Sequence, residues 1–477
     1  MTATPDLARI GGDIERGLAA AGSAAGAVAV VLGERTRVFM HGEVVPREPV
    51  VPSTLFHICS CSKTFTAAVF ARLVQDGSAA WDERACSVVP EFEFSDPRAT
   101  AECTFRDLAS MRVGLGREGI AEWGIDQLLP REERLARARH MPFVAPFRER
   151  FSYSNLCYIA LALAAERLGG KPYQDLVRDL VCTPLGLGDS YSAGFGTGVD
   201  ALAALPSLEV GGKPARVRDL TGPNSEGSAR IHLSVRDAGT WMQSLLALIG
   251  GSDNGFLSAS AVEEMATPHA LVRDADVRMA PGGAEWSYGM GLFTGRLHGH
   301  RLLRHGGGGR GWRHAMVLAP DAGAGVMVMS ASEHPGVEAL ALECVQALLG
   351  ESRDDWSTLF HEAAKAAALE ERTRLESRFP AAPGAPVAAL PPGNYANPVT
   401  GLARVEPDGP GMRIDFEDAP DFAATLEPLG GAVFAFAFDE PALARQPLDP
   451  PFLLRMDAAA AGPVLHTSHF GSLERTA

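Results

Sequence analysis

The hydrophobic and polar positions of this chain change their period twice, which divides it into strand-like, helical and again strand-like parts. Nearly continuous apolar runs at residues 27–41 and around 300–331 are typical of buried strands. Between these runs, apolar residues recur every three or four positions, as on one face of a helix. The expected helices span residues 60–76, 156–168, 172–182 and 235–249, with two more near 336–349 and 354–378. Outer strands around a helical insert predict an α/β sandwich with a site between its halves.

A second unit is predicted after residue 379. Residues 380–390 are rich in proline and alanine, a composition typical of a semi-rigid linker. Residues 391–477 hold short alternating or apolar runs, such as 412–416 and 433–438, separated by glycine and proline. This pattern predicts a small antiparallel sheet or barrel. A length of 477 residues also favours two domains over one compact core.

Composition narrows the classes of partner. A hydrophobic fraction of 46% and a charged fraction of 21% are typical of a soluble globular protein. The net charge of −15 argues against nucleic acid or an anionic membrane surface as a partner. The small-residue run 19–33 is too short for a membrane span and has no basic lead-in. We therefore see no export signal and expect a cytoplasmic protein.

Metal and disulfide chemistry are not expected. The seven cysteines include no Cys-x-x-Cys pair, and several lie in apolar helical runs, so reduced and buried thiols are predicted. His298, His300 and His305 are close in sequence, but no cysteine or carboxylate pattern accompanies them. A structural loop is therefore preferred to a zinc site, and no cofactor is expected.

The first candidate for chemistry is Ser60, which precedes Lys63 by three residues at the start of an expected helix. On a helix, this spacing places both side chains on one face. A serine hydroxyl becomes a good nucleophile only when a base takes its proton. A lysine can be that base where burial and neighbouring charge depress its pKa. The alternative for this motif alone is a capped core helix with an exposed lysine.

Two later motifs offer partners for such a serine. Tyr153 and Asn155 stand two residues apart at the mouth of an expected helix, where both can point into one cleft. A phenol near a lysine ammonium loses its proton more easily, and an asparagine can orient a substrate amide. His305 is followed by four glycines, which allow the backbone to approach a ligand closely. The alternatives are a buried tyrosine that packs an ordinary helix and a flexible loop beside a surface histidine.

In this order, Ser-x-x-Lys, Tyr-x-Asn and His-x-Gly resemble the motifs of the serine penicillin-recognising hydrolases. This family contains class C β-lactamases, D,D-peptidases, D-aminopeptidases and related esterases. The resemblance implies that Ser60 is the acylated nucleophile and that Lys63 and Tyr153 share the general acid and base work. It also implies that Asn155 orients the substrate and that His305 completes the third motif.

The resemblance covers roughly residues 5–350 and implies a β-lactamase-like α/β catalytic domain over residues 1–379. It places the oxyanion hole at the backbone N–H groups of Ser60 and Gly308. Several members of the family carry a C-terminal lipocalin-like β-barrel, which the resemblance implies for residues 391–477.

The third motif departs from the β-lactamase pattern. β-Lactamases of this family usually have Lys-Thr-Gly, whereas this chain has His305 followed by two glycines, a form seen in D-aminopeptidases and esterases. A neutral histidine anchors a substrate carboxylate less well than a fixed ammonium, which disfavours β-lactams as the natural substrate. Arg310 and Arg313 are candidates for that positive charge, and Trp312 for a wall of the substrate pocket. The alternatives are solvated arginines and a tryptophan that packs the hairpin.

Three hypotheses for function follow. The first is a hydrolase of small peptides, amides or esters. The family resemblance alone adds substrates with a D-configured residue beside the scissile bond. The second is a penicillin-binding-protein-type thioesterase that takes a peptidyl thioester from a carrier protein, then releases and cyclises the nonribosomal peptide. The third is a catalytically silent binding protein on the same fold. The pattern leaves a homo-oligomer open.

Overall fold

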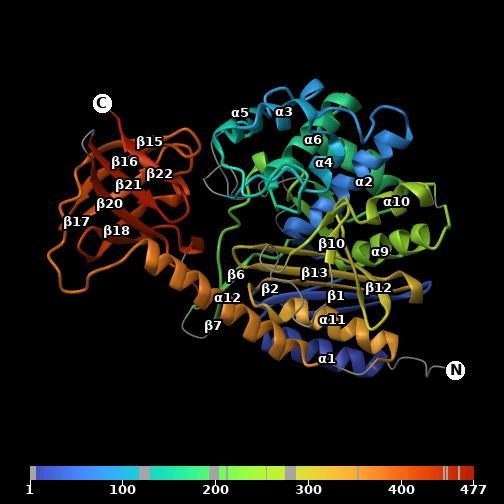
Figure 1. The fold of residues 1–477 in the computed structure, drawn as a ribbon. Helices are drawn as coiled ribbons and strands as arrows, with labels where there is room; N and C mark the ends of the chain where they lie inside the picture. Colours follow the sequence, from blue (N-terminus) through green and yellow to red (C-terminus); the bar gives the residue numbers. More distant parts are fainter. Residues whose placement is uncertain are drawn as a thin grey trace.

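The computed structural model describes residues 7–117, 129–192, 203–210, 213–253, 255–273, 286–351, 354–443, 446, 449–459 and 462–476. Within these ranges the chain forms a nine-stranded sheet between helical layers and a separate closed barrel (Figure 1). The α/β sandwich and the C-terminal barrel predicted from the sequence are confirmed.

The central sheet is antiparallel, and its strand order is β3-β2-β1-β14-β13-β12-β11-β10-β9. Its strands are β1 (Ala25–Leu32), β2 (Arg35–Val45), β3 (Glu48–Pro49), β9 (Ala270–Leu271), β10 (Trp286–Tyr288), β11 (Phe293–Leu297), β12 (His300–Gly309), β13 (Trp312–Ala319) and β14 (Ala324–Ser330). The first long strand pairs with the last, so that Val28 lies opposite Val328. This pairing joins strands from before and after the helical insert in one sheet, as the sequence predicts.

Helices cover both faces of the sheet. The described helices are α1 (Leu7–Ala20), α2 (Ser62–Gln75), α3 (Pro97–Glu102), α4 (Phe105–Ala109), α5 (Arg131–Ala136), α6 (Asn155–Gly169), α7 (Tyr173–Val177), α8 (Thr183–Leu185), α9 (Val235–Ile249), α10 (Ala259–Ala266), α11 (Gly336–Leu349) and α12 (Trp356–Arg378). Helices α1 and α11 lie on one face, and α9 lies on the other with the α2–α6 layer beyond it (Figure 1). Because both faces are covered, β1 is an almost uninterrupted apolar strand.

Two of the predicted helices differ in detail. The helix predicted over 60–76 begins as α-helix only at Ser62, because Cys59–Cys61 form one 3-10 turn, η1, before it. The helix predicted over 172–182 is α7 followed by a π-helical turn, Arg178–Cys182. Ser234 caps α9, since its side chain accepts a hydrogen bond from the N–H of Asp237.

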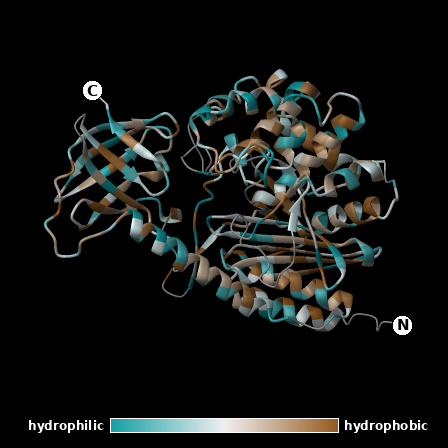
Figure 2. Ribbon diagram, viewed as in Figure 1, coloured by the Kyte–Doolittle hydropathy of each residue, from teal (hydrophilic) through white to brown (hydrophobic). Residues whose placement is uncertain are grey.

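One continuous hydrophobic core fills the space between the sheet and its helices, and a second fills the barrel. Figure 2 shows hydrophobic residues concentrated in the sheet and in the helices packed on it. Two small sheets accompany the central sheet. They contain β4 (Leu55–His57), β5 (Tyr191–Ser192) and β8 (Ile231–Ser234) in one, and β6 (Ser207–Val210) and β7 (Lys213–Arg216) in the other.

The barrel is joined to the sandwich by α12 (Figure 1). Its strands are β15 (Gly393–Asn397), β16 (Gly401–Asp408), β17 (Gly411–Phe416), β18 (Ala424–Gly430), β19 (Val433–Phe438), β20 (Leu453–Ala459), β21 (Gly462–Thr467) and β22 (Ser472–Arg475). Leu375 and Phe379 at the end of α12 pack on Val433 and Leu453 of the barrel. The linker over 380–390 and the exact domain limits stay predictions.

Candidate active site

The nucleophile candidate lies on a tight turn between β4 and α2. Cys59 in η1 adopts φ +49°, a left-handed conformation that is uncommon for a residue other than glycine. The turn is held from behind, because the N–H of Ile231 in β8 donates to Ser62 Oγ at 3.0 Å. Ser60 is half-buried, whereas Cys59 is fully buried. Such a constrained backbone is a frequent feature of functional sites.

Lys63 lies fully buried under Ser60, one turn further along the chain. Its Nζ donates to Ser60 Oγ at 3.1 Å, to Asn155 Oδ1 at 2.9 Å and to the carbonyl oxygen of Ser228 at 2.8 Å. These three acceptors match the three N–H donors of an ammonium group. The lysine is therefore fixed in direction, with one of its three bonds aimed at the serine hydroxyl.

Tyr153 approaches Ser60 from another element. Its hydroxyl donates to Ser60 Oγ at 2.7 Å, and Lys63 Nζ lies 4.9 Å from the centre of its ring. Ser152 docks this segment onto the preceding loop, because its hydroxyl donates to the carbonyl of Leu115 at 2.6 Å. The structure thus brings together Ser60, Lys63, Tyr153 and Asn155, as the sequence predicts.

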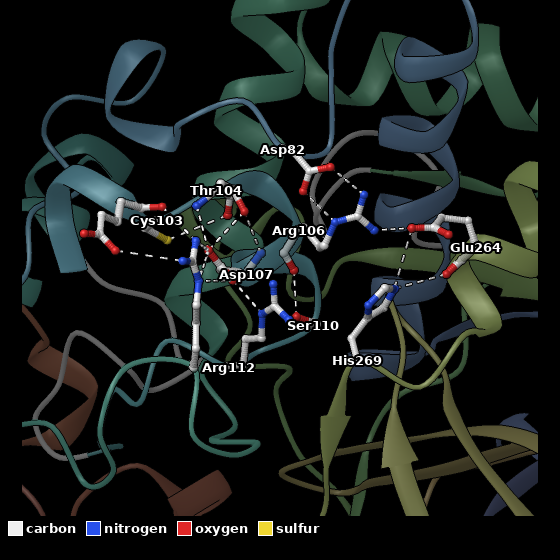
Figure 3. A network of polar contacts seen from close by, with 11 residues as sticks. Asp82, Cys103, Thr104, Arg106, Asp107, Ser110, Arg112, Glu264 and His269 are labelled. Carbon is white, nitrogen blue, oxygen red and sulfur yellow. Dashed lines mark hydrogen bonds and ion pairs between the residues drawn. The ribbon is translucent and has the colours of Figure 1, made fainter. Parts of the chain in front are cut away.

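The loop after α4, which Ser152 contacts through Leu115, is itself anchored by a polar network at α4 (Figure 3). Asp107 accepts hydrogen bonds from the backbone N–H of Thr104 and from the guanidinium of Arg112. Although burial opposes ionisation, Arg148 and Thr104 hold the pKa of Asp107 below its usual value. A charged, fully hydrogen-bonded carboxylate therefore fixes the backbone that leads to the site.

His305 lies in β12 and is buried. Its Nδ1 lies 2.6 Å from the carbonyl oxygen of Gly306, which can only accept, so Nδ1 carries the proton and Nε2 accepts from Tyr288 at 3.2 Å. Burial, and next the charge of Lys63, lowers the pKa of His305 to about 3. The third motif therefore presents a neutral imidazole held by Tyr288.

The glycines after His305 allow β12 to approach the nucleophile turn. A Cβ on Gly307 would lie 2.3 Å from the carbonyl oxygen of Ile58, and one on Gly309 would lie 3.2 Å from Cys59 Sγ. Strand β11 pairs with β12 only as far as Arg304. The part of β12 that follows Arg304 therefore has no partner in the described residues of β11. Gly308 is exposed and lies in the stretch that pairs with β13 but not with β11. An extended substrate backbone can bind at such an edge.

Arg310 and Trp312 have other partners in this structure. Arg310 Nε donates to the carbonyl of Ala442 at 2.8 Å, and its Nη1 lies 2.8 Å from Asp449, both in the barrel segment. Trp312 is 1% exposed and donates from Nε1 to Asp219 at 3.0 Å. A role of either residue in substrate binding stays a prediction.

Three groups at the site escaped the sequence analysis. The carbonyl of Ser228 is a backbone group and carries no residue-type signal. Tyr288 lies in a short strand whose pattern does not distinguish it from a core aromatic. Arg117 lies with its guanidinium carbon 5.0 Å from the centre of the Tyr153 ring, which only the fold reveals.

Within the described part of the chain, no set of three histidine, cysteine or carboxylate side chains is placed to hold a metal ion. No described helix combines the length and apolar character needed to cross a bilayer. The predicted cytoplasmic location stays a prediction.

Comparison with known proteins agrees with the motifs. A family model described as Beta-lactamase matches residues 12–350. The unguisins hydrolase ungD' of Aspergillus campestris is 25% identical over 393 residues, which cover 77% of this chain and 71% of that protein. A D-aminopeptidase of Cereibacter sphaeroides is 26% identical over 393 residues, which cover 81% of this chain and 66% of that protein.

Solved structures support the fold of the whole chain. The octameric penicillin-binding protein homologue from Pyrococcus abyssi has a TM-score of 0.65 at 19% identity and covers 98% of this chain and 100% of its own. The D-amino acid amidase from Ochrobactrum anthropi SV3 has a TM-score of 0.59 at 24% identity, covering 72% of this chain and 97% of its own. At these identities the similarity concerns the fold alone.

Proposed function

Because the chain belongs to the β-lactamase family and is a serine hydrolase of that family, we propose that Ser60 forms an acyl-enzyme with small peptide, amide or ester substrates. The observation that carries this proposal is the convergence of Lys63 and Tyr153 on Ser60 Oγ, at 3.1 and 2.7 Å. Two groups able to move a proton thus contact one hydroxyl, which is the arrangement that activates a serine.

Acylation requires the Tyr153–Lys63 pair to hold one proton fewer than a phenol and an ammonium together, so that the pair can act as the base. Ser60 Oγ then attacks the substrate carbonyl carbon, and its proton passes to this pair. The new C–O bond leaves a tetrahedral oxyanion, for which the N–H groups of Ser60 and Gly308 are the donors. One such donor contributes about 100- to 1000-fold in turnover. The intermediate then collapses, the C–N or C–O bond to the leaving group breaks, and the amine or alcohol takes up the proton.

Deacylation repeats these steps with water as the nucleophile. A water molecule gives its proton to the same pair and attacks the acyl carbon, which releases the carboxylic acid and restores the Ser60 hydroxyl. Asn155 accepts from Lys63 Nζ at 2.9 Å and so helps to hold the lysine in position through both half-reactions. The neutral His305 supports the glycines that follow it, residues 306–309 of β12, which we call the glycine strand. It provides no positive charge to bind a substrate carboxylate.

A second candidate, cyclisation of a peptidyl thioester, has one observation in its favour. Arg310, in the turn after the glycine strand, is bonded to Ala442 and Asp449 of the C-terminal unit, which extends beyond the matched catalytic region. A barrel docked at this turn can shield an acyl-enzyme from water and so favour attack by an amine.

The test is intact mass spectrometry after incubation with p-nitrophenyl esters, D- and L-amino acid anilides, nitrocefin and a peptidyl thioester mimic. We expect an acyl adduct on the wild-type protein and none on Ser60→Ala, whose small side chain suits the turn. Released acid indicates a hydrolase, and a cyclic product from the thioester indicates a cyclase. An adduct that persists in Ser60→Ala contradicts the assignment of the nucleophile. Absence of both adduct and turnover across the panel leaves two interpretations, a narrow substrate specificity or a binding protein that has kept the motifs without the chemistry.

A further inference from the structure

A buried polar cluster, formed by His57, Asp219 and Trp312, lies behind the nucleophile turn. His57 Nδ1 lies 3.1 Å from Asp219 Oδ2, and Trp312 Nε1 donates to the same oxygen at 3.0 Å. The side chains of His57 and Asp219 are only 1% and 4% exposed. None of these contacts belongs to the Ser60, Lys63 and Tyr153 set.

The hydrogen bonds show where the protons of this cluster lie. The backbone N–H of Arg230 donates to His57 Nε2 at 3.0 Å, so Nε2 is an acceptor and the proton lies on Nδ1, directed at Asp219. The N–H of Thr221 donates to the other oxygen of Asp219 at 2.8 Å. Although burial opposes ionisation, the His57 ring and this N–H hold the pKa of Asp219 well below its usual range. Asp219 is therefore an anion with three directed donors.

Two of the three donors, His57 and Trp312, lie next to the two segments that we propose form the oxyanion hole. His57 ends β4, three residues before Ser60, whereas Trp312 opens β13 opposite Gly309 and beside the partner of Gly308. One carboxylate thus ties the nucleophile turn to the glycine strand. Burying the Asp219 carboxylate costs desolvation free energy, and apolar side chains would fill the same volume at a lower cost. We therefore ascribe its presence to the directed hydrogen bonds that it accepts.

We propose that Asp219 is a positioning residue, which holds the N–H groups of Ser60 and Gly308 at the spacing that the oxyanion requires. Trp312 then acts through Asp219 and supports the strand without touching the substrate. This inference rests on the proposed function, because it assigns Asp219 to the same acyl transfer.

The experiment compares Asp219→Asn, Trp312→Phe and the double variant with the wild type, using a p-nitrophenyl ester that acylates Ser60. Asparagine keeps the volume but accepts with only one oxygen, and phenylalanine keeps the ring but removes the donor. We expect kcat to fall about 100-fold in Asp219→Asn, as for a displacement of about 1 Å at a reacting centre. KM should change little, and the loss in the double variant should be smaller than the product of the single losses.

Trp241→Phe is the matched control, since Trp241 is fully buried and its Nε1 has no hydrogen-bond partner among the described residues. All variants are assayed well below their unfolding temperatures, measured by circular dichroism. A folded Asp219→Asn with wild-type kcat overturns the proposal, and so does a loss confined to KM. If Asp219→Asn does not fold, Trp312→Phe decides, and an unchanged kcat there overturns it. Absence of Ser60 acylation in the wild type overturns the proposed function itself.

A separate observation concerns charge at the site. Arg310 and Arg313 are both paired with carboxylates, Asp449 at 2.8 Å and Glu338 at 3.4 Å. Arg117 is exposed, lies over the Tyr153 ring and has no carboxylate partner in the described part of the chain. An exposed guanidinium beside the tyrosine that contacts the nucleophile is suited to a carboxylate, which it can bind in a bidentate manner.

We infer that Arg117 binds a carboxylate of the substrate, so that the preferred substrates are peptides with a free carboxyl group near the scissile bond. This inference also rests on the proposed function. The experiment measures kcat/KM for a matched pair of peptide substrates, one ending in a carboxylate and one in a carboxamide.

In Arg117→Gln we expect kcat/KM for the carboxylate substrate to fall about 10- to 100-fold, which corresponds to one charged hydrogen bond. The carboxamide substrate should be turned over as by the wild type, and Arg117→Lys should recover part of the difference. An equal fall for both substrates means that Arg117 acts through Tyr153 and overturns the inference. No fall for either substrate also overturns it, while turnover of the carboxamide substrate shows that the proposed function still holds.

Discussion

The substitution Gly307→Ala tests whether the distance between the glycine strand and the nucleophile turn controls turnover. The new Cβ would lie 2.3 Å from the carbonyl oxygen of Ile58, two residues before Ser60, and 3.3 Å from Cys61 Sγ. Non-bonded atoms settle at roughly 3.5 Å, so the turn must move away by about 1 Å. A displacement of about 1 Å can cost ~100-fold in rate, and overpacking of this kind costs about 1–3 kcal/mol of stability.

Gly306→Ala is the matched control on the same strand. Its Cβ would point to the opposite face, where the nearest atom, Glu338 Oε1, lies 3.7 Å away at ordinary contact distance. The assay is kcat/KM with an activated ester, together with urea unfolding of each variant. We expect Gly306→Ala to stay within about 3-fold of the wild type and Gly307→Ala to lose most of its activity. A folded Gly307→Ala with wild-type kcat/KM would refute this reasoning.

Three further outcomes are expected. Lys63→Ala and Tyr153→Phe should each slow acylation by about 100-fold or more, measured by burst kinetics. Fully additive losses in the double variant would contradict a shared proton-transfer role. Dialysis against a chelator should leave turnover unchanged; a loss restored by added metal would contradict the mechanism. Burial is the largest cause that lowers the pKa of His305, His232 and His314 to about 3, from 6.5. Between these values the unfolded rings bind protons and the folded ones do not, so stability is complete above pH 6.5 and falls by about 1.4 kcal/mol per pH unit for each ring below it. Urea unfolding across this window measures the slope, and a flat profile would contradict buried neutral rings.

Contacts predicted between site residues are found in the structure where the residues are close in sequence, because the local backbone then sets the distance between their side chains. Ser60 and Lys63 are three residues apart, and one turn of backbone places them in contact whatever surrounds them. Their detailed setting was not predictable in the same way. The helix expected to start at Ser60 begins at Ser62, because the short η1 turn is imposed by β8 and β12 packed against it.

The barrel illustrates the same division. Short alternating runs predict strands from residue 391 onward, because alternation reflects a strand with one buried face. Which strands pair, and that β15 meets β22 to close the barrel, depend on contacts between distant segments. The docking of this barrel against Arg310 is likewise a product of the whole fold.

The sequence by itself determined the candidates for the chemistry: the proposed nucleophile, its two proposed proton-transfer partners and the third motif are readable as residue types at short spacings. The tertiary structure alone decided what surrounds them. The Ser228 carbonyl that orients Lys63, Tyr288 beside His305, and Asp219 between two elements all come from elements other than those of the residues they contact. Such neighbours follow from the packing of a complete core, because no local backbone rule relates residues on different elements.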